Sequence, residues 1–173
     1  MINIHHMTFG LRPTGISPSL RASVIAWWKL DGNSNDASGN GHNGTDTAIT
    51  YTTGKINQAA SFNGTTSKIT VPDSDAFSFN GGSPDKPFSI SLWDYTVGGL
   101  KAYLSKGSAD FLNTNEYDFF FFGSEIYLRL RDKTTNGTFL GVYASFGASF
   151  NAYNHIVATY DGSGTVSGIK IIS

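Results

Sequence analysis

The sequence predicts an all-β domain, either a sandwich or a barrel. From residue 24 onward, short apolar and aromatic runs alternate with turns rich in Gly, Asn, Ser and Asp, such as Asn63-Gly64 and Asp161-Gly162. Short strands at this spacing, separated by NG and DG turns, are typical of both architectures. The run Phe88-Ser89-Ile90-Ser91-Leu92 alternates apolar and polar residues, as does a strand with one buried face. No stretch has helical periodicity longer than about two turns.

Ten strands are expected in chain order. Their ranges are 24–30, 55–62, 67–71, 88–95, 100–105, 116–122, 125–131, 138–146, 153–160 and 166–172. The run 119–122 consists of four phenylalanines and is apolar on both faces, which indicates a strand in the middle of two packed sheets.

Residues 1–22 are expected to form an extended arm that precedes a domain at 23–173. Pro13, Gly15 and Pro18 interrupt this stretch, so neither a helix nor a long strand is favoured there. Arms of this kind either stay disordered or dock on a neighbouring subunit.

The bulk composition excludes several classes of protein. The chain has 173 residues, enough for one domain that buries roughly 70% of its unfolded surface. A net charge of −1 and a charged fraction of 14% argue against a nucleic-acid partner, and no apolar run is long enough to span a membrane. The absence of cysteine excludes disulfides and thiolate chemistry. The N-terminal residues also lack the charged and apolar regions of a secretory signal.

Residues 36–44, here called the glycine loop, combine one carboxylate, two side-chain amides and three glycines. Glycine allows positive φ angles that turn carbonyl groups inward, and Asp and Asn supply the oxygen ligands that calcium prefers. The same composition also occurs in solvated turns with Asx-type hydrogen bonds. The loop therefore predicts either a calcium site or a hydrogen-bonded turn.

The glycine loop belongs to an ordered set of motifs. The others are AWWKLDG at 26–32, GK at 54–55, SFNG at 61–64, ITVP at 69–72, FSISLW at 88–93, LSK at 104–106 and YNHIVATYDG at 153–162. In this order the set, which spans about residues 24–172, resembles the laminin-G-like domains of the concanavalin A-like lectin/glucanase superfamily.

The resemblance implies a concanavalin A-like jelly-roll sandwich of two antiparallel sheets, with Trp28 and Trp93 buried. It also implies a structural calcium ion. By that resemblance, Asp36 and Asn40 direct side chains toward the ion, Gly41 and Gly44 lend carbonyls or shape, and Asp161 contributes from the later turn. Some members of the family keep this loop as a hydrogen-bonded corner without metal, so both alternatives remain open.

Paired carboxylates do not complete a glycosidase mechanism. Glu116 and Asp118 share one strand face by the two-residue period, and the superfamily includes retaining hydrolases with an E-x-D-x-x-E signature. Phe121 occupies the third position here, and an aromatic ring cannot act as a general acid. The second glutamate, Glu125, is expected on the next strand, beyond a Gly-Ser turn. We therefore expect a protein without enzymatic activity.

Aromatic residues make up 14% of the chain and could bind sugars, because their faces stack on sugar rings. Four tyrosines are expected to be exposed as ligand-binding residues: Tyr95, Tyr103, Tyr127 and Tyr143. Of the four histidines, His5 and His6 lie in the arm, His42 lies in the glycine loop, and His155 is expected to be structural. The sequence contains no G-x-S-x-G motif, which argues against a Ser–His nucleophile.

These features predict a non-catalytic recognition or structural module on a virion surface, such as a phage tail or head appendage or a decoration protein, with surface glycans as its ligands. The alternatives are an extracellular carbohydrate-binding or adhesion module cut from a larger protein, and a degenerate glycoside hydrolase. The resemblance also implies closing strands beyond residue 172. Without them, the strand at 24–30 would have an open edge, which residues 1–22 or a neighbouring subunit could cover.

Overall fold

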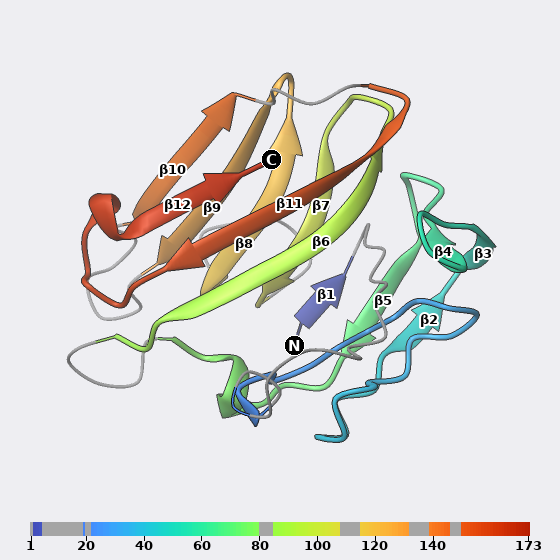
Figure 1. The fold of residues 1–173 in the computed structure, drawn as a ribbon, viewed down its shortest axis with the longest axis horizontal. Helices are drawn as coiled ribbons and strands as arrows, with labels where there is room; N and C mark the ends of the chain where they lie inside the picture. The colour runs from blue at the N-terminus through green and yellow to red at the C-terminus, as the bar shows by residue number, and fades with distance from the viewer. Residues whose placement is uncertain are drawn as a thin grey trace.

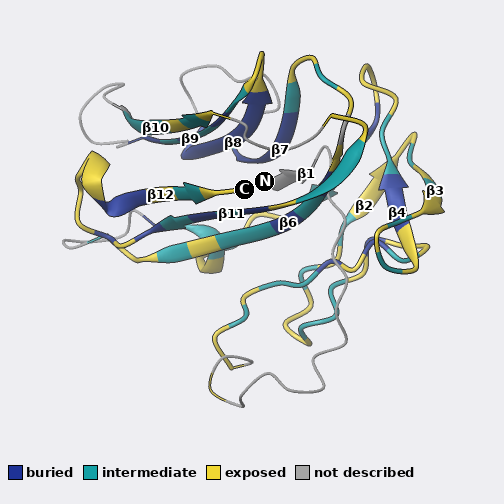
Figure 2. Ribbon diagram, turned by 45° about the horizontal axis from the view of Figure 1, so that its top comes forward, coloured by how far each residue is buried: buried dark blue, intermediate teal, exposed yellow. Residues whose placement is uncertain are grey.

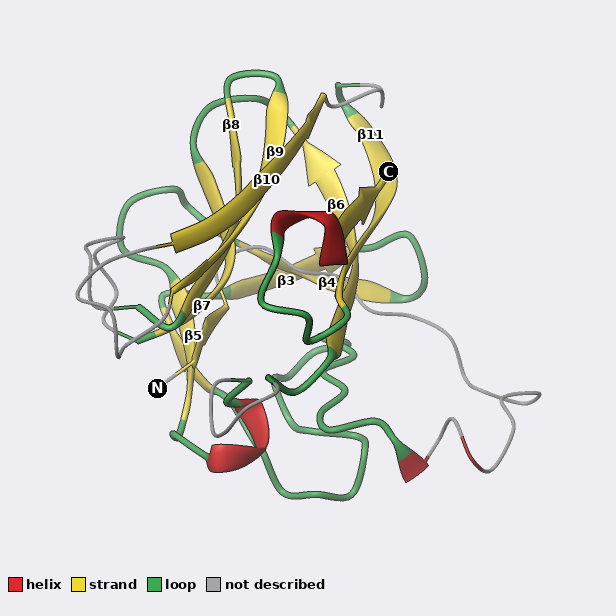
Figure 3. Cartoon of the chain, turned by 90° about the vertical axis from the view of Figure 1, so that its left-hand side faces the viewer, coloured by secondary structure: helices red, strands yellow, loops and turns green. Residues whose placement is uncertain are grey.

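The computed structural model describes residues 2–4, 19, 22–79, 85–107, 115–131, 139–145 and 150–173 (Figure 1). Strands make up about half of this part of the chain, and helical turns lie in the connections between them (Figure 3). The 3-10 turns are η1 (Asp75–Phe77) and η2 (Val166–Gly168). None of the described helices is long and apolar enough to cross a membrane.

The larger sheet has seven strands in the order β10-β9-β8-β7-β1-β5-β2, and all neighbours are antiparallel. Its strands are β1 (Ile2–Ile4), β2 (Thr45–Thr47), β5 (Lys68–Val71), β7 (Lys101–Lys106), β8 (Tyr117–Phe122), β9 (Glu125–Arg131) and β10 (Phe139–Ser145).

The smaller sheet has three antiparallel strands in the order β12-β11-β6, and a separate hairpin pairs β3 with β4. Its strands are β6 (Phe88–Thr96), β11 (Ala152–Tyr160) and β12 (Ile169–Ile172); the hairpin is formed by β3 (Thr50–Thr53) and β4 (Gln58–Ser61). Figure 2 shows β7–β10 as one layer and β6, β11 and β12 as the other. The described residues thus form an all-β sandwich, as the sequence predicts.

The core lies between the two layers and follows the two-residue period of the strands. Phe119 and Phe121 on β8 and Leu128 on β9 are fully buried, and they face Leu92 and Ile156 of the smaller sheet within one apolar cluster. Burial of each such side chain contributes about 1.5–3 kcal/mol. The residues between them on the same strands therefore point outward and form the two outer faces of the sandwich.

The expected strand at 24–30 does not form, which corrects the sequence prediction. Trp28 makes only an isolated bridge to Asp36, and Leu30 has a φ of 56°, outside the extended region. The backbone N–H of Trp27 donates to the Asp36 side chain instead of a neighbouring strand. Residues 166–168 are likewise a 3-10 turn rather than part of a strand. The other eight expected strands are present with bounds shifted by at most a few residues.

Within the predicted arm, residues 2–4 form a strand. β1 lies between β5 and β7, with Ile2 opposite Val71 on one side and Asn3 opposite Ser105 on the other. Because residues 24–30 form no strand, they do not present the open strand edge that was expected. The N-terminal segment pairs instead with β5 and β7. Residues 1, 5–18, 20 and 21 lie outside the described part, and docking of this segment on a neighbouring subunit stays a prediction.

Candidate functional site

The Asp36 carboxylate is the centre of the glycine loop. Its Oδ1 accepts hydrogen bonds from the backbone N–H groups of Trp27 and Ser38, both at 2.9 Å. Its Oδ2 accepts from the Ser38 hydroxyl at 2.8 Å and from the His42 N–H at 3.0 Å. Burial raises the pKa of this carboxyl group, but the hydrogen bonds from Trp27, Ser38 and His42 outweigh burial and hold the pKa below its usual value.

The Asn40 side chain and two glycines of the loop also serve its own structure. The Asn40 amide donates to the carbonyls of Val24 and Ile25, both at 2.9 Å. Gly41 has a φ of 81°, and a Cβ at Gly44 would lie 2.5 Å from a methyl carbon of Ile69. Gly44 is therefore needed for close packing against β5, and Gly41 for a left-handed turn.

A carboxylate offers about four lone-pair positions, and four donors already contact Asp36. Calcium at this carboxylate would have to compete with these donors, so the geometry matches the hydrogen-bonded corner more closely than the metal site. Asp161 accepts from Ser163 in the turn between β11 and β12, and shares no hydrogen-bond partner with Asp36. The described residues contain no group of three or more His, Asp or Glu side chains that could hold a metal. Calcium stays a prediction.

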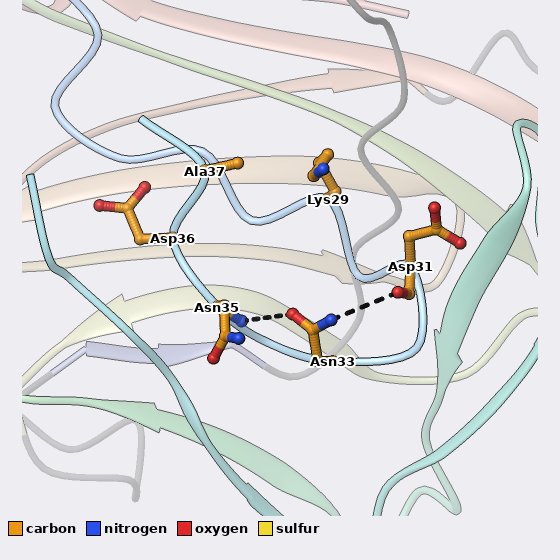
Figure 4. Close-up of a pocket in the computed structure, with 6 residues that line it drawn as sticks. All are labelled: Lys29, Asp31, Asn33, Asn35, Asp36 and Ala37. Atoms are coloured by element: carbon orange, nitrogen blue, oxygen red, sulfur yellow. Dashed lines mark hydrogen bonds between the residues drawn. The ribbon is translucent and has the colours of Figure 1, made fainter. Parts of the chain in front are cut away.

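A polar pocket of 230 Å³ lies beside the glycine loop (Figure 4). It is lined by Lys29, Asp31, Asn33, Asn35, Asp36 and Ala37. The carboxylates of Asp31 and Asp36 point in different directions (Figure 4), and the Asp31 carboxylate accepts from Asn57 and Gln58 at 3.1 and 3.2 Å. The two carboxylates of this pocket therefore do not converge on one point.

Glu116, which the sequence places at the nucleophile position of a glycosidase, is held in a structural network. Its side chain is 1% exposed and lies 3.7 Å from the Lys106 ammonium. Its two oxygens also accept from the backbone N–H of Phe79 at 2.8 Å and from the hydroxyl of Ser78 at 3.2 Å. These contacts fasten the segment before β6 to the larger sheet.

Asp118 is also enclosed, with 0% of its side chain exposed. It accepts from Asn115 at 2.6 Å and from Arg129 at 3.1 Å, and the Arg131 guanidinium lies 3.8 Å away. Phe121, at the general-acid position, is fully buried in the core. Neither carboxylate is exposed to a substrate in this arrangement, and the absence of enzymatic activity stays a prediction.

The tryptophans and histidines divide between the core and the surface. Trp28 is buried as expected, and its indole N–H donates to the His42 carbonyl at 2.7 Å. Trp93 is not buried, contrary to the prediction, because it occupies an outward position of β6. His155 lies opposite Trp93 on β11, and its Nε2 is 2.9 Å from the Ser91 hydroxyl. His5 and His6 lie outside the described residues.

Of the four tyrosines predicted to bind ligand, Tyr103 is buried, so the prediction that it is exposed is wrong. A register shift between Ala102 and Leu104 turns it into the core, where it is 0% exposed and donates to buried Asp94 at 3.1 Å. Tyr127 and Tyr143 lie on the outer face of the larger sheet, and Tyr95 lies on the outer face of the smaller one.

The outward positions of β8, β9 and β10 form a continuous surface, here called the β8–β10 face. It includes Phe120, Phe122, Glu125, Tyr127 and Tyr143, and Arg129 occupies an outward position of β9 and packs over the Phe120 ring. Phe120, Tyr127 and Tyr143 make a cross-strand row with ring centroids 4.9 and 5.6 Å apart. In the next row, Glu125 lies opposite Phe122 and accepts a short hydrogen bond from the Tyr127 hydroxyl.

Two aromatic rings of this face are open to solvent. Tyr143 is 64% exposed and Phe122 is 56% exposed, and they flank the Glu125–Tyr127 pair. Phe122 and Glu125 were not predicted from the sequence as members of a site. Both residues could have been predicted. They flank the two-residue turn Gly123-Ser124, so the alternation of the two strands places them opposite each other on the same face.

Comparison of the chain with protein-family models, with curated proteins and with solved structures gave no match.

Proposed function

We propose that this protein is a non-catalytic recognition module that binds glycans through the β8–β10 face. The observation that carries the proposal is the pairing of two exposed rings, Tyr143 and Phe122, with a carboxylate between them. Sugars have apolar C–H faces and polar rims, and protein sites that bind them combine aromatic surface with a few placed polar groups.

Four members of the face have distinct roles in this proposal. The open ring of Tyr143, on the edge strand of the sheet, stacks on a sugar ring. The Glu125 carboxylate accepts hydroxyl donors from the sugar rim, and the hydrogen bond from Tyr127 fixes its orientation. Phe122 covers the opposite side of the sugar. The Glu125 carboxylate repels an acidic group brought next to it, so the ligand proposed to contact Glu125 is a neutral sugar.

The finer fold assignment is part of the same proposal. Two antiparallel layers, with the glycine loop packed against β5 through Gly44, support a laminin-G-like jelly roll of the concanavalin A-like type. A place on a virion or cell surface stays a prediction.

A glycan array tests this function, followed by calorimetry with the best-bound neutral oligosaccharide. Tyr143→Ala should weaken binding by about tenfold, since aromatic contacts of this kind contribute up to about 1.5 kcal/mol beyond their buried area. Tyr95→Ala is the matched control, because it removes an exposed tyrosine from the opposite layer and should leave neutral-sugar binding unchanged. The proposal fails if the array retains no neutral glycan, or if both variants bind it as the wild type does.

A further inference from the structure

The outer face of the smaller sheet carries a second cluster of aromatic and polar side chains, here called the β6–β11 face. It comprises Ser91, Trp93, Tyr95, Tyr153, His155 and Lys55. Trp93 packs on His155 with centroids 5.0 Å apart, and Tyr95 packs edge-on against Tyr153 at 5.1 Å. Tyr95 is 40% exposed, and His155 and Lys55 are also exposed.

The cation of this face is held in place by its neighbours. The Lys55 ammonium lies over the Trp93 ring, 5.4 Å from its centroid, and makes no ion pair with a carboxylate of the described residues. The hydroxyl of Tyr153 donates to the carbonyl of Thr53 at 2.8 Å, which ties β11 to the hairpin that carries Lys55. The Lys55 ammonium is therefore placed beside the Trp93 ring at the edge of this face.

The β6–β11 face differs in charge from the β8–β10 face, where Glu125, Asp118 and Arg129 bring charges of both signs. None of the outward positions that the structure describes on β6, β11 and β12 is occupied by Asp or Glu. These positions are Ser89, Ser91, Trp93, Tyr95, Tyr153, His155, Val157, Thr159, Lys170 and Ile172. Lys55 thus supplies positive charge beside a strand surface without carboxylates, whereas Lys170 interacts electrostatically with Asp161 in the turn after β11.

We propose that the β6–β11 face is a second binding surface and that its ligand is an acidic oligosaccharide, a chain of sugar rings bearing carboxylates. The sugar ring packs on Tyr95, and its carboxylate pairs with the Lys55 ammonium. The Ser91 hydroxyl and the His155 ring lie on the same surface, within reach of the sugar hydroxyls. This site is independent of the proposed neutral-glycan site, because the two lie on opposite outer faces of the sandwich.

The probe for this site is trigalacturonate, with its methyl ester as the uncharged counterpart. Isothermal titration should show that the wild type binds the acid and that added salt weakens this binding, since the ion pair is exposed. The ester should bind at least fivefold more weakly. Lys55→Gln should weaken acid binding about fivefold and leave ester binding unchanged, in keeping with the modest strength of an exposed ion pair. Tyr95→Ala should weaken acid binding, because it removes the ring on which the sugar is proposed to pack.

The matched control is Tyr143→Ala, which should bind the acid as the wild type does. Thermal melting of each variant confirms that it is folded. The proposal is overturned if the Tyr143→Ala variant binds the ester as tightly as the acid, if Lys55→Gln leaves acid binding unchanged, or if Tyr143→Ala abolishes acid binding. It is also overturned if single-stranded DNA binds to this face and trigalacturonate does not, since the surface would then serve a different polymer.

Discussion

Replacing Asp118 with Asn tests the ionic network beneath the β8–β10 face. The substitution keeps the shape of the side chain and its acceptor for Asn115, but removes the charge that lies 3.1 Å from Arg129 and 3.8 Å from Arg131. Arg129 remains stacked over the Phe120 ring, 4.6 Å from its centroid. Breaking a buried ion pair by removing one partner typically costs about 3–5 kcal/mol.

A loss of this size is a large fraction of the roughly 5–15 kcal/mol by which domains are stable. For a chain of this length it corresponds to a fall in Tm of about 6–20 °C. Equilibrium unfolding in urea, followed by tryptophan fluorescence, measures the change, and the slope of the transition should stay constant if unfolding remains two-state.

The matched control is Glu125→Gln, which neutralises a partly exposed carboxylate on the same face and should change stability by less than about 1 kcal/mol. The double variant Asp118→Asn with Arg129→Gln should lose less than the sum of the single losses, because the two side chains contact each other. A loss below about 1 kcal/mol for Asp118→Asn, or strict additivity in the cycle, would refute the network.

Three further predictions concern pH and metal. The Lys106 ammonium lowers the pKa of Asp73 to about 2. The stabilisation from this ion pair should be complete above pH 4 and should disappear as the pH falls toward 2. Asp73→Asn should therefore flatten the acid unfolding curve in that range. Burial and the hydrogen bond to Asp85 raise the pKa of Tyr160 to about 12; this stabilisation should persist below pH 10 and disappear as the pH rises through 12, and Tyr160→Phe should remove this alkaline transition. Asp36→Ala should destabilise the fold by about 2–3 kcal/mol because four donors lose their acceptor. Thermal melts with calcium or EDTA test whether the loop binds calcium, since bound calcium must raise the wild-type Tm and leave that of the variant unchanged.

The strands that the sequence predicts well are those whose two faces differ. β9 begins at Glu125 and ends at Arg131, as expected, because alternating apolar residues follow a two-residue turn. β6 and β11 match for the same reason. The strand β1 was missed because three residues are too few to show a period, and its partners β5 and β7 follow some 65 to 105 positions later.

Outward positions were harder to assign than core positions. Tyr103 lies between Ala102 and Leu104, and only the register shift in β7 turns its ring inward to Asp94. Trp93 follows the alternation of β6 outward, although the resemblance implies burial. Local pattern thus predicted the side of Trp93 better than the resemblance did, whereas Tyr103 depends on an irregularity that the pattern does not contain.

The glycine loop shows why residue types alone do not distinguish a metal site from a structural corner. Both need a carboxylate, amides and glycines in close succession, because both gather oxygens and backbone groups around one point. What separates them is the number of N–H and O–H donors that face the carboxylate. Asp36 meets four, two of them from Trp27 and His42, which lie on either side of it in the sequence. The Asp36 carboxylate thus links the backbone at Trp27 to the backbone at His42. Its removal should therefore destabilise the fold whether or not calcium is present.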